Sequence, residues 1–273
     1  MSIWRTRPLF AIAVAVFCFA STAARGVEFA AHRALYTMTL VNAEAGSGIA
    51  AVAGKMAVEW RNACTGWTFE YRSVIDVDFA ERDPLRLSTS ATTWESRDGR
   101  DYRFSVRHKT NGEDTERLEG TAVGRKEDRQ GRVDFTEPKP RKMTLPPGTL
   151  FPIAHSSAIM KVLAQGRTPA FLSRMVFDGM DVDGLYQVSA AIGNVLPGQE
   201  GVLPADGSMS GMKSWPVDLA YFSASSKKPE PDHEIQMHLY ANGVADDMVM
   251  EFDDFTVRAT IGRLELLADP PCR

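Results

Sequence analysis

Apolar and polar residues alternate with a period of two along most of this chain. In residues 69–79, for example, the apolar residues alternate with charged ones: Phe69, Tyr71, Ile75, Val77 and Phe79 alternate with Glu70, Arg72, Asp76 and Asp78. This alternation is typical of strands with one face on a core and the other in water, and such strands form antiparallel sheets. The same period recurs in residues 102–106, 186–192, 215–221, 235–239 and 248–252. The pattern therefore predicts an all-β, mostly antiparallel protein.

Turn residues separate these segments at intervals typical of hairpins. Asp-Gly and Asn-Gly pairs supply the positive φ angles that tight hairpin turns require. They occur at Asp98-Gly99, Asn111-Gly112, Asp178-Gly179, Asp206-Gly207 and Asn242-Gly243. Strands with turn signals roughly every 8–12 residues indicate a sandwich, a barrel or a strongly curled sheet.

One segment, near residues 156–165, has the pattern of a helix. Ser156 or Ser157 can cap its first turn, and Gly166 can end it. Its apolar stripe consists of Ile159, Val162 and Leu163. We expect this to be the main helix of the protein.

A proline-rich bridge, residues 138–152, separates a strand-rich segment (25–137) from another (167–273). Prolines at this density favour extended backbone outside sheet ladders. All-β folds of about this length are often single domains. We therefore expect residues 25–273 to form one domain.

Residues 1–24 have the features of an export signal. Arg5 and Arg7 precede an apolar run from Leu9 to Ala20, which small residues follow. Such a segment is removed on export, here after Ala23 or Ala24. The alternative is an uncleaved membrane anchor, but the run is shorter than the ~20 residues that span a bilayer.

Cleavage would remove Cys18 and leave Cys64 and Cys272 as the two cysteines of the mature chain. In an oxidising compartment, two lone cysteines favour one disulfide. A bridge to Cys272 would also limit fraying at the chain end. The alternative is two unpaired, buried thiols.

The composition excludes several classes of protein. A content of 44% hydrophobic and 24% charged residues is ordinary for a globular protein. The formal net charge of -4 excludes a broad nucleic-acid interface, which needs clustered Lys and Arg. Three cysteines are too few for a disulfide-rich scaffold or a four-cysteine zinc site.

The chain has no catalytic motif with the required spacing. His233-Glu234 is followed by His238, one residue too far for the helical zinc motif, and a strand would direct the two histidines to opposite faces. Residues 207–211 have Met209 where a nucleophile elbow needs serine. We therefore predict no catalytic residues and no cofactor.

Three aspartates followed by glycine in residues 178–184 suggest a calcium loop. The position that should carry its bidentate carboxylate is Ser189 or Ala190, however. Because Asp and Gly dominate turns in general, an aspartate-rich turn is the favoured interpretation. We predict no metal site.

Several methionines accompany aromatic residues on the predicted inner faces. Methionine is flexible and polarizable, so it adapts to irregular gaps or to varied apolar ligands. Our candidates for lining an apolar ligand site are Met38, Trp67, Met237 and Met250. The alternative is that they only fill the core. A curled sheet with one helix cannot easily cover its concave face, which leaves room for a cleft.

Several short motifs follow one another in order over nearly all of the mature chain. They are Cys64-Thr65-Gly66-Trp67, Trp94-Glu95-Ser96-Arg97-Asp98-Gly99, Gly148-Thr149-Leu150-Phe151-Pro152, Phe177-Asp178-Gly179, Asn242-Gly243-Val244, Asp254-Phe255 and Cys272. Through this series the chain resembles the EipB-like family of bacterial periplasmic cell-envelope integrity proteins. Residues 231–234 depart from the family pattern, in which a more aromatic entry to the strand is expected.

The resemblance implies a monomer built on a long, spiralling antiparallel sheet that forms an open bowl or half-barrel. It also implies a disulfide between Cys64 and Cys272, and a place in the periplasm of an alphaproteobacterium. Family members are associated with maintaining the envelope against stress and are not known as enzymes. Their half-barrels resemble those of lipid-handling periplasmic proteins, although a shared fold does not transfer a function.

We therefore expect a non-enzymatic periplasmic protein that supports envelope integrity. It would bind an apolar ligand (a lipid or lipoprotein) or an envelope protein partner on a concave β surface. The alternative is an exported hydrolase acting on envelope polymers, for which the chain supplies no spaced set of acid, base and nucleophile. A third hypothesis is a scaffold that docks another envelope protein through a strand edge or loops.

Overall fold

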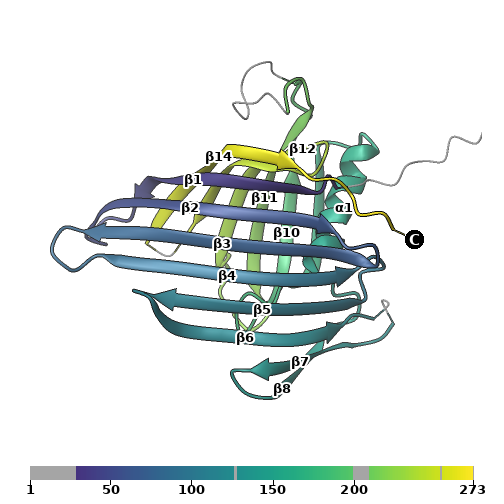
Figure 1. Cartoon of the computed structure of the whole chain (residues 1–273), viewed down its shortest axis with the longest axis horizontal. Helices are drawn as coiled ribbons and strands as arrows, with labels where there is room; N and C mark the ends of the chain where they lie inside the picture. The colour runs from purple at the N-terminus through teal and green to yellow at the C-terminus, as the bar shows by residue number, and fades with distance from the viewer. Residues whose placement is uncertain (1–28, 126–127, 199–208, 253, 273) are drawn as a thin grey trace, which may run out of the picture.

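The computed structural model of the chain describes residues 29–125, 128–198, 209–252 and 254–272. Over these residues the backbone forms a 14-stranded sheet and an α-helix (Figure 1). The predicted export signal and its cleavage site lie outside the described residues. In the part of the chain that is described, no helix has the length and apolar character needed to cross a membrane.

The elements follow the turn signals closely. In chain order they are β1 (His32–Ala43), β2 (Ile49–Asn62), β3 (Gly66–Phe79), β4 (Leu85–Ser96), β5 (Asp101–Thr110), β6 (Glu113–Val123), β7 (Gly131–Glu137), β8 (Arg141–Leu145), α1 (Pro152–Ala164), β9 (Ala170–Phe177), β10 (Leu185–Ile192), β11 (Ser214–Ser223), β12 (His233–Tyr240), β13 (Ala245–Glu251) and β14 (Phe255–Leu266).

The sheet is a meander whose first and last strands pair with each other. Its order is β8-β7-β6-β5-β4-β3-β2-β1-β14-β13-β12-β11-β10-β9, and the named strands pair antiparallel throughout. Long twisted strands make such a sheet curl, and a bulge between Leu35 and Tyr36 adds to the bend at the β1–β14 pair. In Figure 1 the yellow β14 accordingly lies beside the purple β1.

The two edges of the sheet are joined through one short connection. Leu150, which follows β8, forms a parallel bridge to Val176 of β9. The Leu150 amide donates to the Met175 carbonyl (2.9 Å), and the Phe177 amide donates to the Leu150 carbonyl (3.0 Å). The sheet is thereby nearly closed into a barrel, which confirms the all-β antiparallel prediction and the curled sheet.

The predicted alternation decides which side chains face the interior. Along β5, Tyr102, Phe104 and Val106 are buried, whereas Arg103 and Ser105 between them are exposed. Each strand thus buries one face and leaves the other in water, as its period of two requires.

Tight turns occur at most of the Asn-Gly and Asp-Gly pairs. Asn111 and Gly112 connect β5 to β6 with φ values of 51° and 87°. Positive φ at both central residues gives the backbone twist that a two-residue hairpin needs. The predicted turn at Asp206-Gly207 lies outside the described residues.

The helix begins earlier than predicted. It starts at Pro152 rather than at Ser156 or Ser157, and its N-cap residue, Phe151, makes no side-chain capping hydrogen bond. Proline at the first helical position has the φ angle of a helix and needs no amide partner, which explains the earlier start. Gly166 ends the helix with φ 63°, as predicted.

The proline-rich bridge was predicted to lie outside the sheet ladders, and this is wrong in part. Residues Arg141–Leu145 form β8, which pairs with β7. The prolines nearest to this strand lie on both sides of it rather than within it: they are Pro138, Pro140, Pro146 and Pro147. Because β8 is an edge strand, neighbouring prolines remove no ladder hydrogen bond.

The disulfide between Cys64 and Cys272 is confirmed. The two residues are 208 positions apart in the sequence, and their Cα atoms are 5.4 Å apart. Cys64 lies in the turn between β2 and β3, and Cys272 follows β14. The bridge therefore joins the chain end to the strand pair that adjoins β1.

Candidate ligand-binding cavity

The interior beneath β4–β8, called here the aromatic half, is filled by the protein's own side chains. Tyr102 stacks on Phe151 at 5.0 Å between ring centroids, and Phe104 meets Phe177 edge-on at 5.6 Å. Both Phe151 and Phe177 are fully buried. The Tyr102 hydroxyl donates to the Asp178 carbonyl (2.6 Å), which holds the β9–β10 turn against this cluster.

The interior beneath β1–β3 and β11–β13, called here the cavity half, is only partly filled by side chains. It contains a more enclosed space of about 310 Å³, the inner compartment, and a neighbouring space of about 570 Å³, the outer compartment. Both are lined by Trp60, Phe69, Tyr71, Pro152, Ser156, Asp178, Tyr221, Ile235 and Met250. These volumes are within the range of sites for small molecules, about 300–1,000 Å³.

The inner compartment is mainly apolar and lies between the sheet and α1. Its further lining residues are Phe29, His32, Tyr36, Met56, Val58, His155, Ile159, Met160, Val176, Val217, Leu219, Met237, Leu239, Gly243, Ala245 and Met248. The buried residues of the helix, Ile159 and Leu163 among them, belong to the same hydrophobic cluster as Val188 of β10 and Val217 of β11. It therefore forms one side of the cavity.

The outer compartment is richer in polar groups. Its further lining residues are Thr93, Tyr102, Ile153, Met180, Asp181, Tyr186, Asp232, His233, Glu234, Glu251 and Phe252. Two of these carboxylates have internal donors: the Tyr186 hydroxyl donates to Asp181, and the Ser223 amide donates to Asp232 at 2.6 Å.

The structure divides the four residues predicted to line a ligand site into two pairs. Met237 and Met250 line the cavity, and Met250 lies where the compartments meet. Met38 is 1% exposed and sits over Gly54, where an added Cβ would lie 2.6 Å from its Cε. Trp67 is buried edge-on against Phe29, at 6.0 Å between ring centroids. Met38 and Trp67 therefore belong to the packed wall, because their neighbours fill the space around them.

Sequence reasoning did not select Trp60 or Ile235, which line both compartments. Both residues occupy inward-facing positions of their alternating strands, but so do the residues that fill the aromatic half. Alternation shows which residues face inward but not where inward side chains fail to meet, so it could not distinguish the cavity from the packed core.

Asp178 lies where the two compartments meet. Burial raises the pKa of its carboxyl to about 7, although the Met180 amide donates to Oδ1 at 2.9 Å and opposes the shift. The same turn contains a second local hydrogen bond, from the Asp183 amide to Asp181 Oδ1 (2.8 Å). Among the described residues, no group of three or more His, Cys, Asp or Glu is placed to hold a metal ion.

Three histidines line the compartments, and each is held toward its neutral form. Burial, with a smaller contribution from Arg174, lowers the pKa of His155 to about 4. Burial also lowers the pKa of His32, against the opposing hydrogen bond to the Ala30 carbonyl. Burial lowers the pKa of His233 as well, although two nearby aspartates oppose it.

A second buried carboxyl, Glu95 of β4, serves the helix rather than the cavity. It is 1% exposed, and it accepts hydrogen bonds from the backbone amides of Ile153 (2.7 Å) and Ala154 (2.8 Å). These are first-turn amides of α1 that have no partner within the helix. Burial raises the pKa of Glu95 to about 7, and the two amide hydrogen bonds oppose that shift.

The hydrolase alternative requires two carboxyls, or a nucleophile and a base, that converge on one accessible space. Of the two carboxyls whose pKa is raised to about 7, Asp178 faces the cavity, whereas Glu95 is not part of the lining of either compartment. The Thr89 hydroxyl lies 3.0 Å from His108 Nδ1, yet neither residue lines the cavity. The cavity thus brings together apolar surface and scattered polar groups, an arrangement suited to binding.

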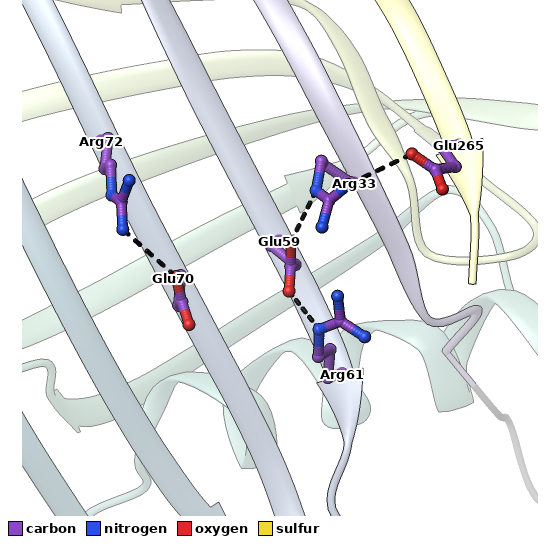
Figure 2. A network of polar contacts seen from close by, with 6 residues as sticks. All are labelled: Arg33, Glu59, Arg61, Glu70, Arg72 and Glu265. Carbon is purple, nitrogen blue, oxygen red and sulfur yellow. Dashed lines mark hydrogen bonds and ion pairs between the residues drawn. The ribbon is translucent and has the colours of Figure 1, made fainter. Parts of the chain in front are cut away.

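The outer face of the same wall carries paired charges (Figure 2). Arg33 contacts Glu59 at 2.6 Å and Glu265 at 3.3 Å, and it thereby links β1 to both neighbouring strands. Arg61 also contacts Glu59, while Arg72 lies 3.7 Å from Glu70 on β3. Exposed pairs of this kind contribute little to stability, but they place an arginine beside each of these three glutamates.

Fold, disulfide and cavity together define a β-barrel-like protein with an apolar interior space. Residues 23–268 match the model of the EipB-like family, and the chain belongs to that family. It is 30% identical over 253 residues to the cell envelope integrity protein EipB from Brucella abortus (strain 2308), covering 92% of this chain and 89% of that protein.

A solved structure supports the same fold. It is the crystal structure of a β-barrel-like protein of a domain of unknown function from Brucella abortus. That structure matches with a TM-score of 0.78 at 29% identity, and the match covers 89% of this chain and 100% of that one. The family membership and the fold thus agree with the resemblance seen in the sequence motifs.

Proposed function

We propose that this protein supports the integrity of the cell envelope, as an exported, non-catalytic protein, by holding the apolar part of a ligand in its cavity. The name of its Brucella relative supports the envelope role. The observation that carries the binding role is the pair of adjoining compartments, of about 310 and 570 Å³, in a protein whose other half is densely packed. An export signal and a disulfide fit an oxidising compartment outside the cytoplasm.

An environment-sensitive naphthylamine dye tests whether the cavity takes up apolar molecules. We expect the wild-type protein to bind the dye with a rise in fluorescence. Met250→Trp fills the junction of the compartments and should weaken binding at least about tenfold, or 1.4 kcal/mol. The control, Val74→Trp, places the same ring on the outer face of β3, where Val74 is 39% exposed, and should bind as wild type does.

Two results would count against the binding role. One is a wild-type protein that takes up no dye, and the other is equal binding by Met250→Trp and wild type. Circular dichroism of each variant shows whether its sheet is intact. In the source bacterium, a strain lacking the gene should become sensitive to detergent. Wild type and Val74→Trp should restore resistance, whereas Met250→Trp should not.

A further inference from the structure

The charges around the outer compartment are of one sign. Asp181, Asp232, Glu234 and Glu251 line it, together with Asp178, whose raised pKa of about 7 leaves its carboxyl only partly charged at neutral pH. No Lys or Arg among the described residues lines either compartment. None of these five carboxylates forms an ion pair with a Lys or Arg in the described part of the chain. Carboxylates with low-dielectric walls around them favour a cation in the space that they enclose.

The histidines of the lining do not offset this charge. Burial lowers the pKa of His32, His155 and His233, so that each is held toward the neutral form at pH 7. Lys227 and Lys228 lie in the exposed loop between β11 and β12 and are not part of the lining. The cavity therefore offers apolar walls and negative charge together.

The carboxylates on the outer face of β2, β3 and β14 differ from those at the outer compartment. There, Glu59, Glu70 and Glu265 each have an arginine partner (Figure 2). At the outer compartment, Glu234 and Glu251 have no such partner within the described residues. These unpaired carboxylates leave negative charge beside the compartment, which a cationic group would neutralise on binding.

A metal ion does not fit this arrangement. The carboxylates are spread around the compartment, and no three potential ligands within the described residues are placed to hold a metal ion. A bulky organic cation needs no such convergence, because its charge is diffuse and its contacts are long-range.

The inner compartment provides a second polar feature that lacks a partner. His155 is 5% exposed and lines this space, and its Nε2 atom has no hydrogen-bond partner among the described residues. Leaving a buried polar atom unsatisfied costs free energy. An occupant with a hydrogen-bonding group near its apolar chain would satisfy it.

We propose that the ligand is a single-chain amphiphile with a cationic ammonium head group, its chain in the inner compartment and its head among the carboxylates of the outer one. This inference rests on the proposed binding function and specifies its ligand class. An anionic amphiphile of the same chain length would place like charges next to each other and would bind more weakly.

Three detergents with the same 12-carbon chain test the head group: dodecyltrimethylammonium, dodecyl maltoside and dodecyl sulfate. Each detergent is titrated against the bound naphthylamine dye at pH 7 in low salt, below the concentration at which that detergent forms micelles. Displacement of the dye measures its binding. We expect the ammonium compound to bind at least about tenfold more tightly than the sulfate, with the maltoside between them. Added salt should reduce the difference, because it screens the carboxylates.

The matched variants are E234Q/E251Q at the compartment and E70Q/E265Q on the outer wall, which remove the same net charge. The first should reduce the preference for ammonium over sulfate at least about threefold and leave maltoside binding unchanged. The second should leave the preference as it is in wild type.

The outcomes separate the two proposals. Sulfate binding as tight as ammonium binding, or an unchanged preference in E234Q/E251Q, overturns the head-group inference and leaves the apolar cavity function standing. A preference that both double variants reduce equally would reflect net charge alone and would also overturn it. If none of the three detergents displaces the dye, the cavity takes up no amphiphile and both proposals are wrong.

Discussion

The aromatic half and the cavity half are built on the same plan, yet only one of them is filled. In the aromatic half, Tyr102, Phe104, Phe135, Phe151 and Phe177 meet one another at 5.0–6.3 Å between ring centroids. In the cavity half, the inward side chains leave two compartments between the sheet and α1. The comparison shows that alternation determines which side chains face the interior, whereas the size and position of those side chains decide whether the interior is filled.

Glycines make the dense packing of the aromatic half possible. An added Cβ at Gly179 would lie 2.8 Å from Phe104 Cγ, and one at Gly120 would lie 2.7 Å from Phe104 Cζ. Gly179 also has a φ of 67°, which other residues rarely adopt. The ring of Phe104 therefore occupies space that side chains at these positions would take.

The largest effect should come from the disulfide, which ties the segment after β14 to the β2–β3 turn of the cavity half. Cys64→Ser or Cys272→Ser should lower the free energy of unfolding by up to about 5 kcal/mol, the chain-entropy limit for a loop of this length. Urea denaturation of the oxidised protein measures the loss. Hydrogen exchange should rise more in β1, β2 and β14 than in β5–β7. Identical unfolding of the wild type with and without reductant would contradict this prediction.

A smaller but still large effect should distinguish the packing of the two halves. Phe177→Ala removes a fully buried ring from the aromatic cluster and should cost about 3–5 kcal/mol. Met237→Ala removes a partly exposed cavity-lining side chain and should cost about 1 kcal/mol, since little new cavity surface is created. Chemical denaturation of both variants gives the comparison. Equal losses would show that the cavity half is as densely packed as the aromatic half.

The smallest effect concerns the pH dependence that Glu95 adds at the junction of β4 and α1. Its pKa is raised from 4.5 to about 7 in the folded protein, so the folded state binds the proton more tightly than the unfolded state does. Its contribution to stability is therefore greatest below pH 4.5 and is lost as the pH rises to about 7, up to about 3 kcal/mol in all.

Thermal unfolding of the wild type and Glu95→Gln between pH 5 and 8 tests this contribution. The wild type should lose more stability than the variant as the pH rises. Asp178, whose pKa is also raised to about 7, should give the variant a residual slope of the same sign. The histidine contributions are common to both proteins and cancel in the comparison. Parallel profiles would show that Glu95 does not titrate in this range.

Much of the wall could be predicted from local pattern. The strand around Phe69 and Tyr71, the turn at Asn111-Gly112 and the helix end at Gly166 all depend on neighbours close in sequence. Pro152 is a local signal for the start of the helix, but the group that accepts its first amides, Glu95, comes from β4, 58 residues away. No local signal links those positions.

The residues of the candidate site could likewise be predicted only in part from the sequence. Met237 and Met250 could be identified as inward-facing, and so could Met38, but only the first two line the cavity. What separates them is the close approach of Gly54 to Met38 across the β1–β2 pair. Such contacts depend on strand register and on side chains from distant strands.

The amino-acid sequence by itself determined the antiparallel β structure with its short turns, the helix that ends before Gly166, and the pair of distant cysteines that follow the predicted export signal. Each of these features depends on local periodicity, backbone preference or residue count. Only the tertiary structure decided that aromatic rings fill one half of the barrel and leave an acidic, apolar-walled space in the other. The physical reason is that a cavity is defined by side chains that do not meet, and their separation is set by the curvature of the whole sheet.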